Sequence, residues 1–173
     1  MTDDPKPKSH GRLSISASLK PRDLMDDSRH VKGAWAARVI TLFPEAFPGT
    51  LGLSLTGKAL DLGLWRLDTL DLRTFGDGKH RNVDDTPAGG GAGMVLRADV
   101  LDRALQQAAL GTPDRTRWPV VYLSPRGTHF DQTMARRFAA CDGITLLCGR
   151  FEGVDQRVLD HHAIEEVSLG DMS

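Results

Sequence analysis

The chain has 173 residues, of which 40% are hydrophobic and 26% are charged, and its formal net charge is −1. These values are typical of a single α/β domain with its own core, and they exclude an overall electrostatic attraction to nucleic acid, so any such contact needs a local basic patch. No apolar run approaches the ~20 residues that a membrane span requires.

The two cysteines, Cys141 and Cys148, lie outside any metal-binding spacing. We therefore expect reduced, buried thiols, a cytoplasmic protein that does not enter the membrane, and no metal cluster. His161 and His162 are adjacent, and on a helix they are expected to point in different directions.

The first 34 residues are polar and rich in Pro, Ser and Asp, with no hydrophobic segment of a signal peptide. We interpret residues 1–34 as a flexible extension, and residues 35–173 as the ordered domain. Residues 37–43 predict a first strand that Pro44 closes. A helix is expected over residues 53–62, with Ser54 as its N-cap, and the alternation of residues 64–72 predicts a strand near the edge of the sheet.

Residues 74–93 form a long polar, glycine-rich loop. Lys79, His80 and Arg81 provide local positive charge for phosphates, and Asp84 and the adjacent Asp85 follow them. The run Gly89, Gly90 and Gly91 suits either a flexible linker or backbone that lies flush against a ligand, and it does not belong to a Walker A motif. Composition leaves a linker and a functional loop equally open.

The remainder of the chain alternates between helices and strands. Helices are expected over residues 98–110, 131–141 and 155–162, and strands over 118–123, 144–148 and 164–167. This order predicts an α/β fold with a mostly parallel sheet and helices on both faces. The loops 124–127 and 149–153 then leave the same edge of the sheet, where 169–172 could join them to form a ligand site.

Gly149–Gly153 is the strongest candidate for a functional loop, because two glycines allow a ligand to approach the backbone. The plain alternative is a tight turn with a surface ion pair between Arg150 and Glu152. A dinucleotide-binding oxidoreductase also fits such a sheet, but the first strand is not followed by the pattern GxGxxG.

Six blocks of sequence share a resemblance, in order and with sensible spacing: LFPEAF at 42–47, GKALDLGL at 57–64, HRNVDDTPAGGGAGM at 80–94, VVYLSPRG at 120–127, LLCGRFEGVDQRV at 146–158 and EEVSLGD at 165–171. Together they resemble the bacterial tRNA (guanine-N1)-methyltransferase family. The resemblance implies a SPOUT-type trefoil knot, a homodimer, and transfer of a methyl group from S-adenosyl-L-methionine to N1 of the tRNA guanosine 3′ of the anticodon.

The resemblance also implies roles for matching residues. Arg150 and Glu152 are expected near the reacting methyl as supporting catalytic residues, with no metal ligand assigned and the need for a divalent ion left open. The expected substrate-binding residues are His80, Arg81, Asp84, Gly89, Gly90 and Gly91. The expected cofactor-binding residues are Tyr122, Leu123, Ser124, Pro125, Gly127, Gly149, Gly153, Leu169, Gly170, Asp171 and Met172.

Guanine N1 carries a proton at neutral pH, so its methylation needs a general base. In the family this base is an aspartate after the knot, and no position of this chain matches it or the C-terminal tRNA-binding domain. Arg126, Phe151 and Met172 also depart from the usual family residues. We therefore expect this chain to be an inactive part of a methyltransferase, and the alternative is a non-catalytic remnant that binds cofactor or dimerises.

Overall fold

The computed structural model describes residues 33–87, 90, 92–112 and 114–170. The expected extension at residues 1–34 therefore lies almost wholly outside the described residues, and so do Gly89, Gly91, Asp171 and Met172. The strands are β1 (Trp35–Thr41), β2 (Trp65–Asp71), β3 (Asp84–Asp85), β4 (Val95–Leu96), β5 (Val120–His129), β6 (Gly143–Leu147) and β7 (Glu165–Ser168). The helices are α1 (Ser54–Asp61), α2 (Ala98–Ala109), α3 (Gln132–Ala139) and α4 (Gln156–His161), with short 3-10 turns η1 (Pro44–Ala46), η2 (Gly49–Gly52) and η3 (Leu72–Phe75).

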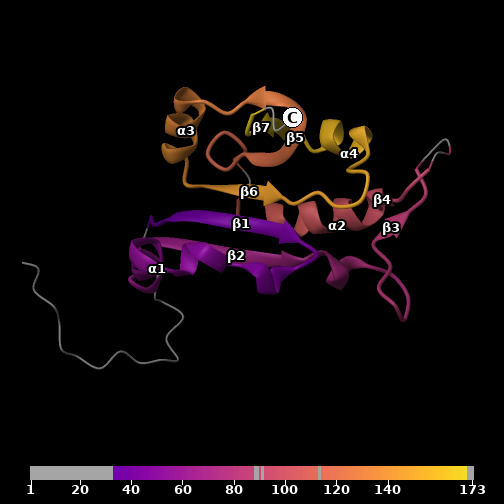
Figure 1. Ribbon diagram of the computed structural model, residues 1–173, viewed down its shortest axis with the longest axis horizontal. Coiled ribbons are helices and arrows are strands. Elements are labelled where there is room, and N and C mark those ends of the chain that lie inside the picture. The colour runs from indigo at the N-terminus through magenta and orange to yellow at the C-terminus, as the bar shows by residue number, and fades with distance from the viewer. Residues whose placement is uncertain (1–32, 88–89, 91, 113, 171–173) are drawn as a thin grey trace, which may run out of the picture.

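Five strands form one parallel sheet in the order β2-β1-β6-β5-β7, which confirms the predicted parallel α/β architecture with β2 at an edge. β6 lies between β1 and β5, and its apolar sequence suits a strand that is covered on both faces. The segment that carries β3 and β4 projects at the end of the sheet where β1, β2 and β6 finish, whereas α1 and α3 lie toward the opposite end (Figure 1).

Helices cover both faces of the sheet, because successive residues of a strand point to opposite sides. Val120 and Tyr122 of β5 belong to the larger core, which α2 and α4 complete, whereas Val121 faces a smaller core with Phe138 of α3. The amphipathic pattern of α2 predicted its buried side chains correctly: Val100, Leu101, Ala104, Leu105 and Ala108.

β5 does not end at Leu123 as the sequence predicted, because the strand continues to His129. Leu123 and Thr128 both lie in register with Val167 of β7, so residues 124–127 bulge out of the ladder between them. The Oγ of Ser124, which is buried, accepts a hydrogen bond from the backbone N–H of Arg126 at 3.2 Å and holds the bulge. Residues 124–127, expected as an exit loop, are therefore a bulge inside a strand. The local sequence pattern is the same for a loop and for a bulge, so it could not distinguish them.

The helix expected from residue 53 forms as α1, but the assignment of Ser54 as its N-cap is wrong. Leu53 is the N-cap, and Ser54 is the first helical residue, with a φ of +53°. The apolar positions of this segment are also not buried: Leu53, Leu55 and Leu62 are 65%, 78% and 53% exposed. Helical periodicity located the helix, but the apolar stripe faces away from the core of this chain.

Two further expectations need correction. Cys141 and Cys148 are free but only half-buried. His161 and His162 do not diverge, since their ring centroids lie 5.0 Å apart. The reason is that α4 ends at His161, and His162 follows with φ −93° and ψ 6°, outside regular helical geometry. Within the described ranges, no helix is long and apolar enough to cross a membrane.

Candidate active site

A pocket of about 960 Å³ opens where β6 ends, beside Tyr122 and Leu123 of β5 and ahead of the bulge in that strand. Neighbouring parallel strands bring Tyr122 and Leu123 of β5 beside the loop that follows β6. The loop contributes every residue from Gly149 to Gly153, and these form most of one wall. The remaining lining residues are Val39, Phe47, Leu146, Leu147 and Cys148.

Gly149 lies directly against the ring of Tyr122. A Cβ atom at this position would be 2.7 Å from Cε2 and 2.9 Å from Oη of Tyr122, closer than such atoms approach in proteins. A Cβ at Gly153 would be 3.4 Å from the same hydroxyl. Both glycines therefore let the loop backbone pack flush against the tyrosine, with peptide groups rather than side chains facing that part of the pocket.

The backbone of this loop has hydrogen-bonding capacity left over. Among the described residues, no acceptor lies within hydrogen-bonding distance of the backbone N–H groups of Gly149, Arg150 and Phe151. All three residues are exposed, so these N–H groups are open to solvent and to a ligand that enters the pocket. Three consecutive donors at the wall of a pocket are therefore suited to polar atoms of a ligand.

The two charged residues of the loop have different neighbours. The guanidinium carbon of Arg150 lies 5.3 Å from the ring centroid of Phe43, a cation–π contact that holds this cation beside the pocket. Glu152 instead packs against the glycine-rich loop, since a Cβ at Gly93 would lie 2.5 Å from Cγ of Glu152. The simple ion pair between Arg150 and Glu152 is not among the salt bridges of the described residues.

Backbone hydrogen bonds join the pocket loop to the segment around β4. The N–H of Glu152 donates to the carbonyl of Met94 at 2.9 Å, and the N–H of Leu96 donates to the carbonyl of Gly153 at 3.2 Å. Leu96 is 1% exposed and Val83 is 3% exposed, so the long loop is anchored in the larger core at both positions. This arrangement favours a functional loop over a linker, an alternative that composition alone left open.

An ion-pair network fixes the base of the projecting segment to α2. Arg97 donates to Asp77 at 2.8 Å and to Asp99 at 2.7 Å, and Arg103 reaches both carboxylates at 3.2 Å. The hydrogen bond from Arg97 holds the pKa of Asp99 below its ordinary value. Arg103 also donates to the carbonyl of Phe75 at 2.7 Å, so two positions ahead of the turn that carries His80 and Arg81 are bound to α2.

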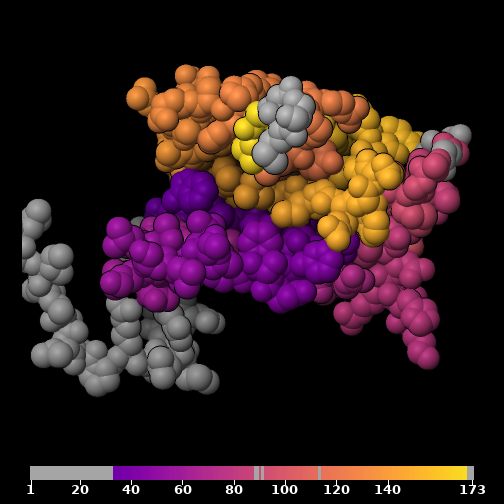
Figure 2. Space-filling model, in the orientation of Figure 1, coloured from indigo at the N-terminus to yellow at the C-terminus, as the bar shows by residue number. Residues whose placement is uncertain are grey.

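The expected substrate-binding residues that the structure describes lie on this projecting segment. His80 and Arg81 are exposed in a turn, where the N–H of Arg81 donates to the carbonyl of Gly78 at 3.2 Å. Asp84 is half-buried in β3 and pairs with Leu96 of β4, and Gly90 is exposed beyond it. Figure 2 shows the segment (magenta) projecting from the body beside the gold segment around α4. The basic turn is thus outside the pocket, on the surface that extends from it.

The described residues of the expected third loop, Leu169 and Gly170, are not part of this pocket. Leu169 lines a separate apolar hollow of about 560 Å³ that also includes Leu123 and Phe130. Gly170 lies near the end of β5, with its N–H 3.3 Å from Oγ of Ser168. Ser124 and Pro125 lie in the β5 bulge and Gly127 packs against β7, so none of these lines the pocket either. Of the expected cofactor-binding residues that the structure describes, it brings together Tyr122, Leu123, Gly149 and Gly153, but not Ser124, Pro125, Gly127, Leu169 and Gly170.

Sequence reasoning missed Glu166 of β7. Its Oε1 is buried and has no hydrogen-bond partner within the described part of the chain, and its nearest cation is Arg126 at 3.9 Å. Burial, with a further contribution from Glu166, raises the pKa of Tyr122, so this hydroxyl stays neutral. Burial also raises the pKa of Cys148, which keeps its thiol out of nucleophilic chemistry. Nothing in the sequence singles out Glu166, because no glycine or turn residue lies beside it within β7.

Asp155 caps α4 and so fixes the helix that follows the pocket loop. Its Oδ1 accepts from the backbone N–H of Arg157 at 2.9 Å, and its Oδ2 accepts from the guanidinium at 2.6 Å. The side-chain and backbone hydrogen bonds from Arg157 lower the pKa of Asp155 from 3.8 to about 2. Because the pKa is lower in the folded chain, the charged cap stabilises the fold above about pH 4, and this stabilisation is lost as the pH falls toward 2.

We expect D155N to lower the free energy of unfolding slightly near neutral pH, with the difference from wild type shrinking below about pH 4. Asn is a matched replacement because it caps helices about as well as Asp but carries no charge. Urea unfolding of both proteins across this pH range measures the difference. A difference that stays constant down to about pH 2 would contradict the assignment.

The pocket and the projecting segment both lie within the part of the chain that matches known proteins. The sequence profile described as tRNA (Guanine-1)-methyltransferase TrmD matches residues 36–173. A protein of Cereibacter sphaeroides named tRNA (guanine-N(1)-)-methyltransferase is 75% identical over 142 residues, covering 82% of this chain and 57% of the relative. Proteins with that name from Ruegeria pomeroyi and Rhizobium etli are 65% identical over 147 residues (85% of this chain, 60% of the relative) and 55% identical over 138 residues (80% and 58%). The chain spans less than two thirds of the length of these relatives, and it belongs to the tRNA (guanine-1)-methyltransferase family.

Proposed function

We propose that this chain supplies the methyl-donor site and the guanosine-facing loop of a tRNA (guanine-N1)-methyltransferase. The proposed donor is S-adenosyl-L-methionine, and the proposed acceptor is N1 of the guanosine 3′ of the anticodon. The observation that carries the proposal is the pair of backbone hydrogen bonds between Met94–Leu96 and Glu152–Gly153. They place the wall of the pocket directly against the segment expected to meet the target base.

The residues of the pocket suit S-adenosyl-L-methionine. Its adenine and ribose need backbone donors and apolar contact, which the N–H groups of Gly149–Phe151 and the side chains of Leu123 and Leu147 offer. A larger residue at Gly149 would move Tyr122, so the flush backbone depends on glycine there. When bound, the donor supplies an electrophilic sulfonium methyl group.

Residues of this chain act on the reaction mainly by position. In-line displacement requires the two reacting atoms within about 3.5 Å of each other, so a wall that holds the donor and touches the acceptor loop contributes directly to the rate. Arg150, held over Phe43, places positive charge beside the pocket, where charge develops on guanine as N1 loses its proton. Asp84 is proposed to position the guanine through its N–H groups.

Recognition of tRNA is proposed for the exposed turn with Lys79, His80 and Arg81. These side chains supply a local basic patch on a chain whose net charge is −1. Phosphate contacts of this kind position a nucleic acid without reading its sequence. Gly89, Gly90 and Gly91 are proposed to let the backbone of the same loop approach the acceptor.

A homodimer, a SPOUT-type knot and a cytoplasmic location are also proposed, as the resemblance implies. The exposed leucines of η2, α1 and the residues after α1 support an interface, because large apolar groups on one contiguous segment mark protein contacts. Gly127 supports close threading of the chain, since a Cβ there would lie 2.4 Å from backbone atoms of Glu166 and Val167. The proposed donor residues Ser124, Pro125, Gly127, Leu169 and Gly170, which lie outside the pocket, would join it in that arrangement. Asp171 and Met172 are proposed to bind the donor as well.

Calorimetric titration of the 173-residue polypeptide with S-adenosyl-L-methionine tests the donor site. We expect one donor bound per chain and no binding of NAD, which separates the proposal from a dinucleotide-binding oxidoreductase. We expect no methyl transfer to tRNA by this polypeptide, because none of its positions matches the family's general base. N1-methylguanosine formed by it would contradict that expectation.

Titration of the polypeptide with tRNA distinguishes part of a methyltransferase from a non-catalytic remnant. Under the proposal, tRNA binds the polypeptide, and replacement of the two cations Lys79 and Arg81 weakens binding for all tRNA sequences and reduces its salt dependence. The matched control replaces Lys58 of α1, a cation on another element, and leaves tRNA binding unchanged. Donor binding without any tRNA binding would favour the remnant.

A further inference from the structure

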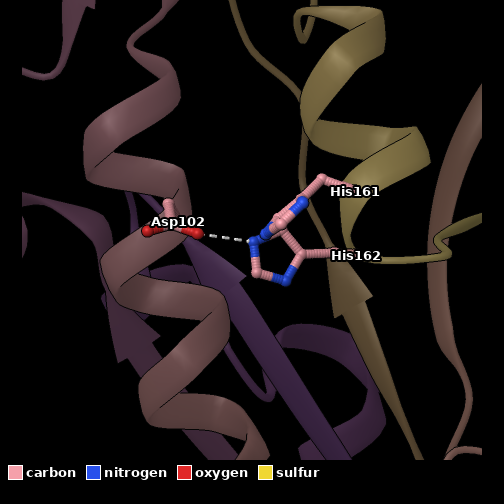
Figure 3. A group of neighbouring side chains, drawn as sticks. All are labelled: Asp102, His161 and His162. Carbon is pink, nitrogen blue, oxygen red and sulfur yellow. Dashed lines mark hydrogen bonds and ion pairs between the residues drawn. The ribbon is translucent and has the colours of Figure 1, made fainter.

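A cluster of metal-binding side chains lies outside the pocket, between α2 and the end of α4. One nitrogen each of His161 and His162 and one carboxylate oxygen of Asp102 all lie within 4.8 Å of one another. Nε2 of His162 is 2.8 Å from Oδ1 of Asp102. Figure 3 shows both imidazoles turned toward the same carboxylate, with His162 nearer to it.

The cluster is built from sequence positions far apart and is held from behind. Nε2 of Gln106, one turn along α2, donates to the other carboxylate oxygen of Asp102 at 2.8 Å and so fixes its orientation. Partners of this kind, which orient a ligand without touching the ion, accompany most metal sites in proteins. Because His162 is half-buried and His161 is exposed, an ion would reach the site directly from solvent.

We propose that Asp102, His161 and His162 bind a divalent transition-metal ion of the zinc type. Two imidazoles and one carboxylate are a ligand set that zinc accepts, with water in the fourth position. Ligand atoms around tetrahedral zinc lie about 3.4 Å apart, so pairs near the 4.8 Å limit need to close by little more than 1 Å. Rotation of the exposed His161 side chain supplies most of that movement. Nε2 of His162 and Oδ1 of Asp102, hydrogen-bonded at 2.8 Å, would move apart slightly and exchange that hydrogen bond for bonds to the ion.

The ion would connect two helices that begin beside the two halves of the candidate active site. α2 starts directly after β4, and α4 starts directly after the pocket loop. Asp102 lies on α2, and His161 and His162 end α4, so a bound ion cross-links the two supports. The proposed ion therefore has a structural role, because it holds α2 and α4 together. Its site is separate from that of any divalent ion that acts on the reaction itself.

Titration of the 173-residue polypeptide with Zn²⁺ tests the proposal. We expect one Zn²⁺ per chain, a higher melting temperature with Zn²⁺, and reversal by a chelator. H161A and D102N are each expected to weaken binding at least about tenfold, since even indirect partners of a ligand contribute that much. H161A removes an exposed side chain, so the fold of this variant is expected to be intact, and circular dichroism checks it.

H129A is the matched control, because His129 is exposed on β5 and is not part of the cluster. It is expected to bind Zn²⁺ as wild type does. Co²⁺ in place of Zn²⁺ should give an absorption spectrum without a thiolate charge-transfer band, which excludes Cys141 and Cys148 as ligands. Wild-type affinity in H161A, a thiolate band, or failure of the wild type to take up one equivalent would each overturn the proposal.

Discussion

Gly149→Ala is expected to lower the affinity for S-adenosyl-L-methionine by about tenfold to a hundredfold. The added methyl group would lie 2.7 Å from the ring of Tyr122, so either the ring or the loop must move, at a cost of about 1–3 kcal/mol for overpacking. Both groups line the pocket, so their displacement changes the surface that the donor meets. Isothermal titration calorimetry measures the affinity.

A double-mutant cycle with Tyr122→Leu separates this clash from general damage to the loop. In the Y122L background the methyl group has room, so G149A is expected to cost far less than in the wild type, although Y122L alone also weakens binding. Gly111→Ala is the control for a destabilising glycine loss away from the pocket: Gly111 lies after α2 in open space, and alanine at its φ of +78° strains the backbone but is expected to leave the donor affinity unchanged. Equal costs of G149A in both backgrounds would show that the contact with Tyr122 is not responsible.

Gly127→Ala is expected to give the largest loss of stability, about 3 kcal/mol in the free energy of unfolding. The new Cβ would lie 2.4 Å from the carbonyl carbon of Glu166 and from the nitrogen of Val167. These are backbone atoms of β7, which no rotamer change can move, so β7 must shift away from β5. Val167 is 1% exposed, and its displacement also opens the smaller core. Urea denaturation with a two-state fit measures the loss.

Arg126→Ala, in the same bulge, is the control for this effect. Its side chain is 74% exposed, and its guanidinium lies 3.9 Å from the buried Oε1 of Glu166, so its loss removes a cation from that carboxylate and is expected to cost less than G127A. If G127A unfolds at the same urea concentration as R126A, the bulge is not packed against β7 as described.

The sequence predicted those features that depend on short-range patterns. The buried face of α2, the helices that begin near Asp131 and Asp155 and the apolar run of β6 follow from periodicity within a few residues, and both aspartates prove to be N-caps. Gly149 and Gly153 could be assigned to a ligand loop because parallel neighbouring strands finish at a common edge. The pocket confirms that these glycines, Tyr122 and Leu123 come together.

Features that depend on distant partners could not be predicted in this way. The bulge in β5 exists because Leu123 and Thr128 share Val167 as a partner, some forty residues along the chain. The approach of the two histidines to Asp102 depends on how α4 ends and where α2 lies, neither of which adjacency in sequence reveals. Glu166 has no turn or glycine beside it, and only its burial without a hydrogen-bond partner sets it apart.

The two backbone hydrogen bonds between the pocket loop and the segment around β4 have a thermodynamic consequence. A ligand that orders residues 149–153 also orders residues 94–96, so part of the entropy that the acceptor loop must lose is already lost when the acceptor arrives. The proposed donor and acceptor are therefore expected to bind with positive cooperativity, and linkage requires each to raise the affinity of the other by the same factor. The hydrogen-bonded junction thus makes a pair of adjacent sites respond as one unit, without any rearrangement of the sheet beneath them.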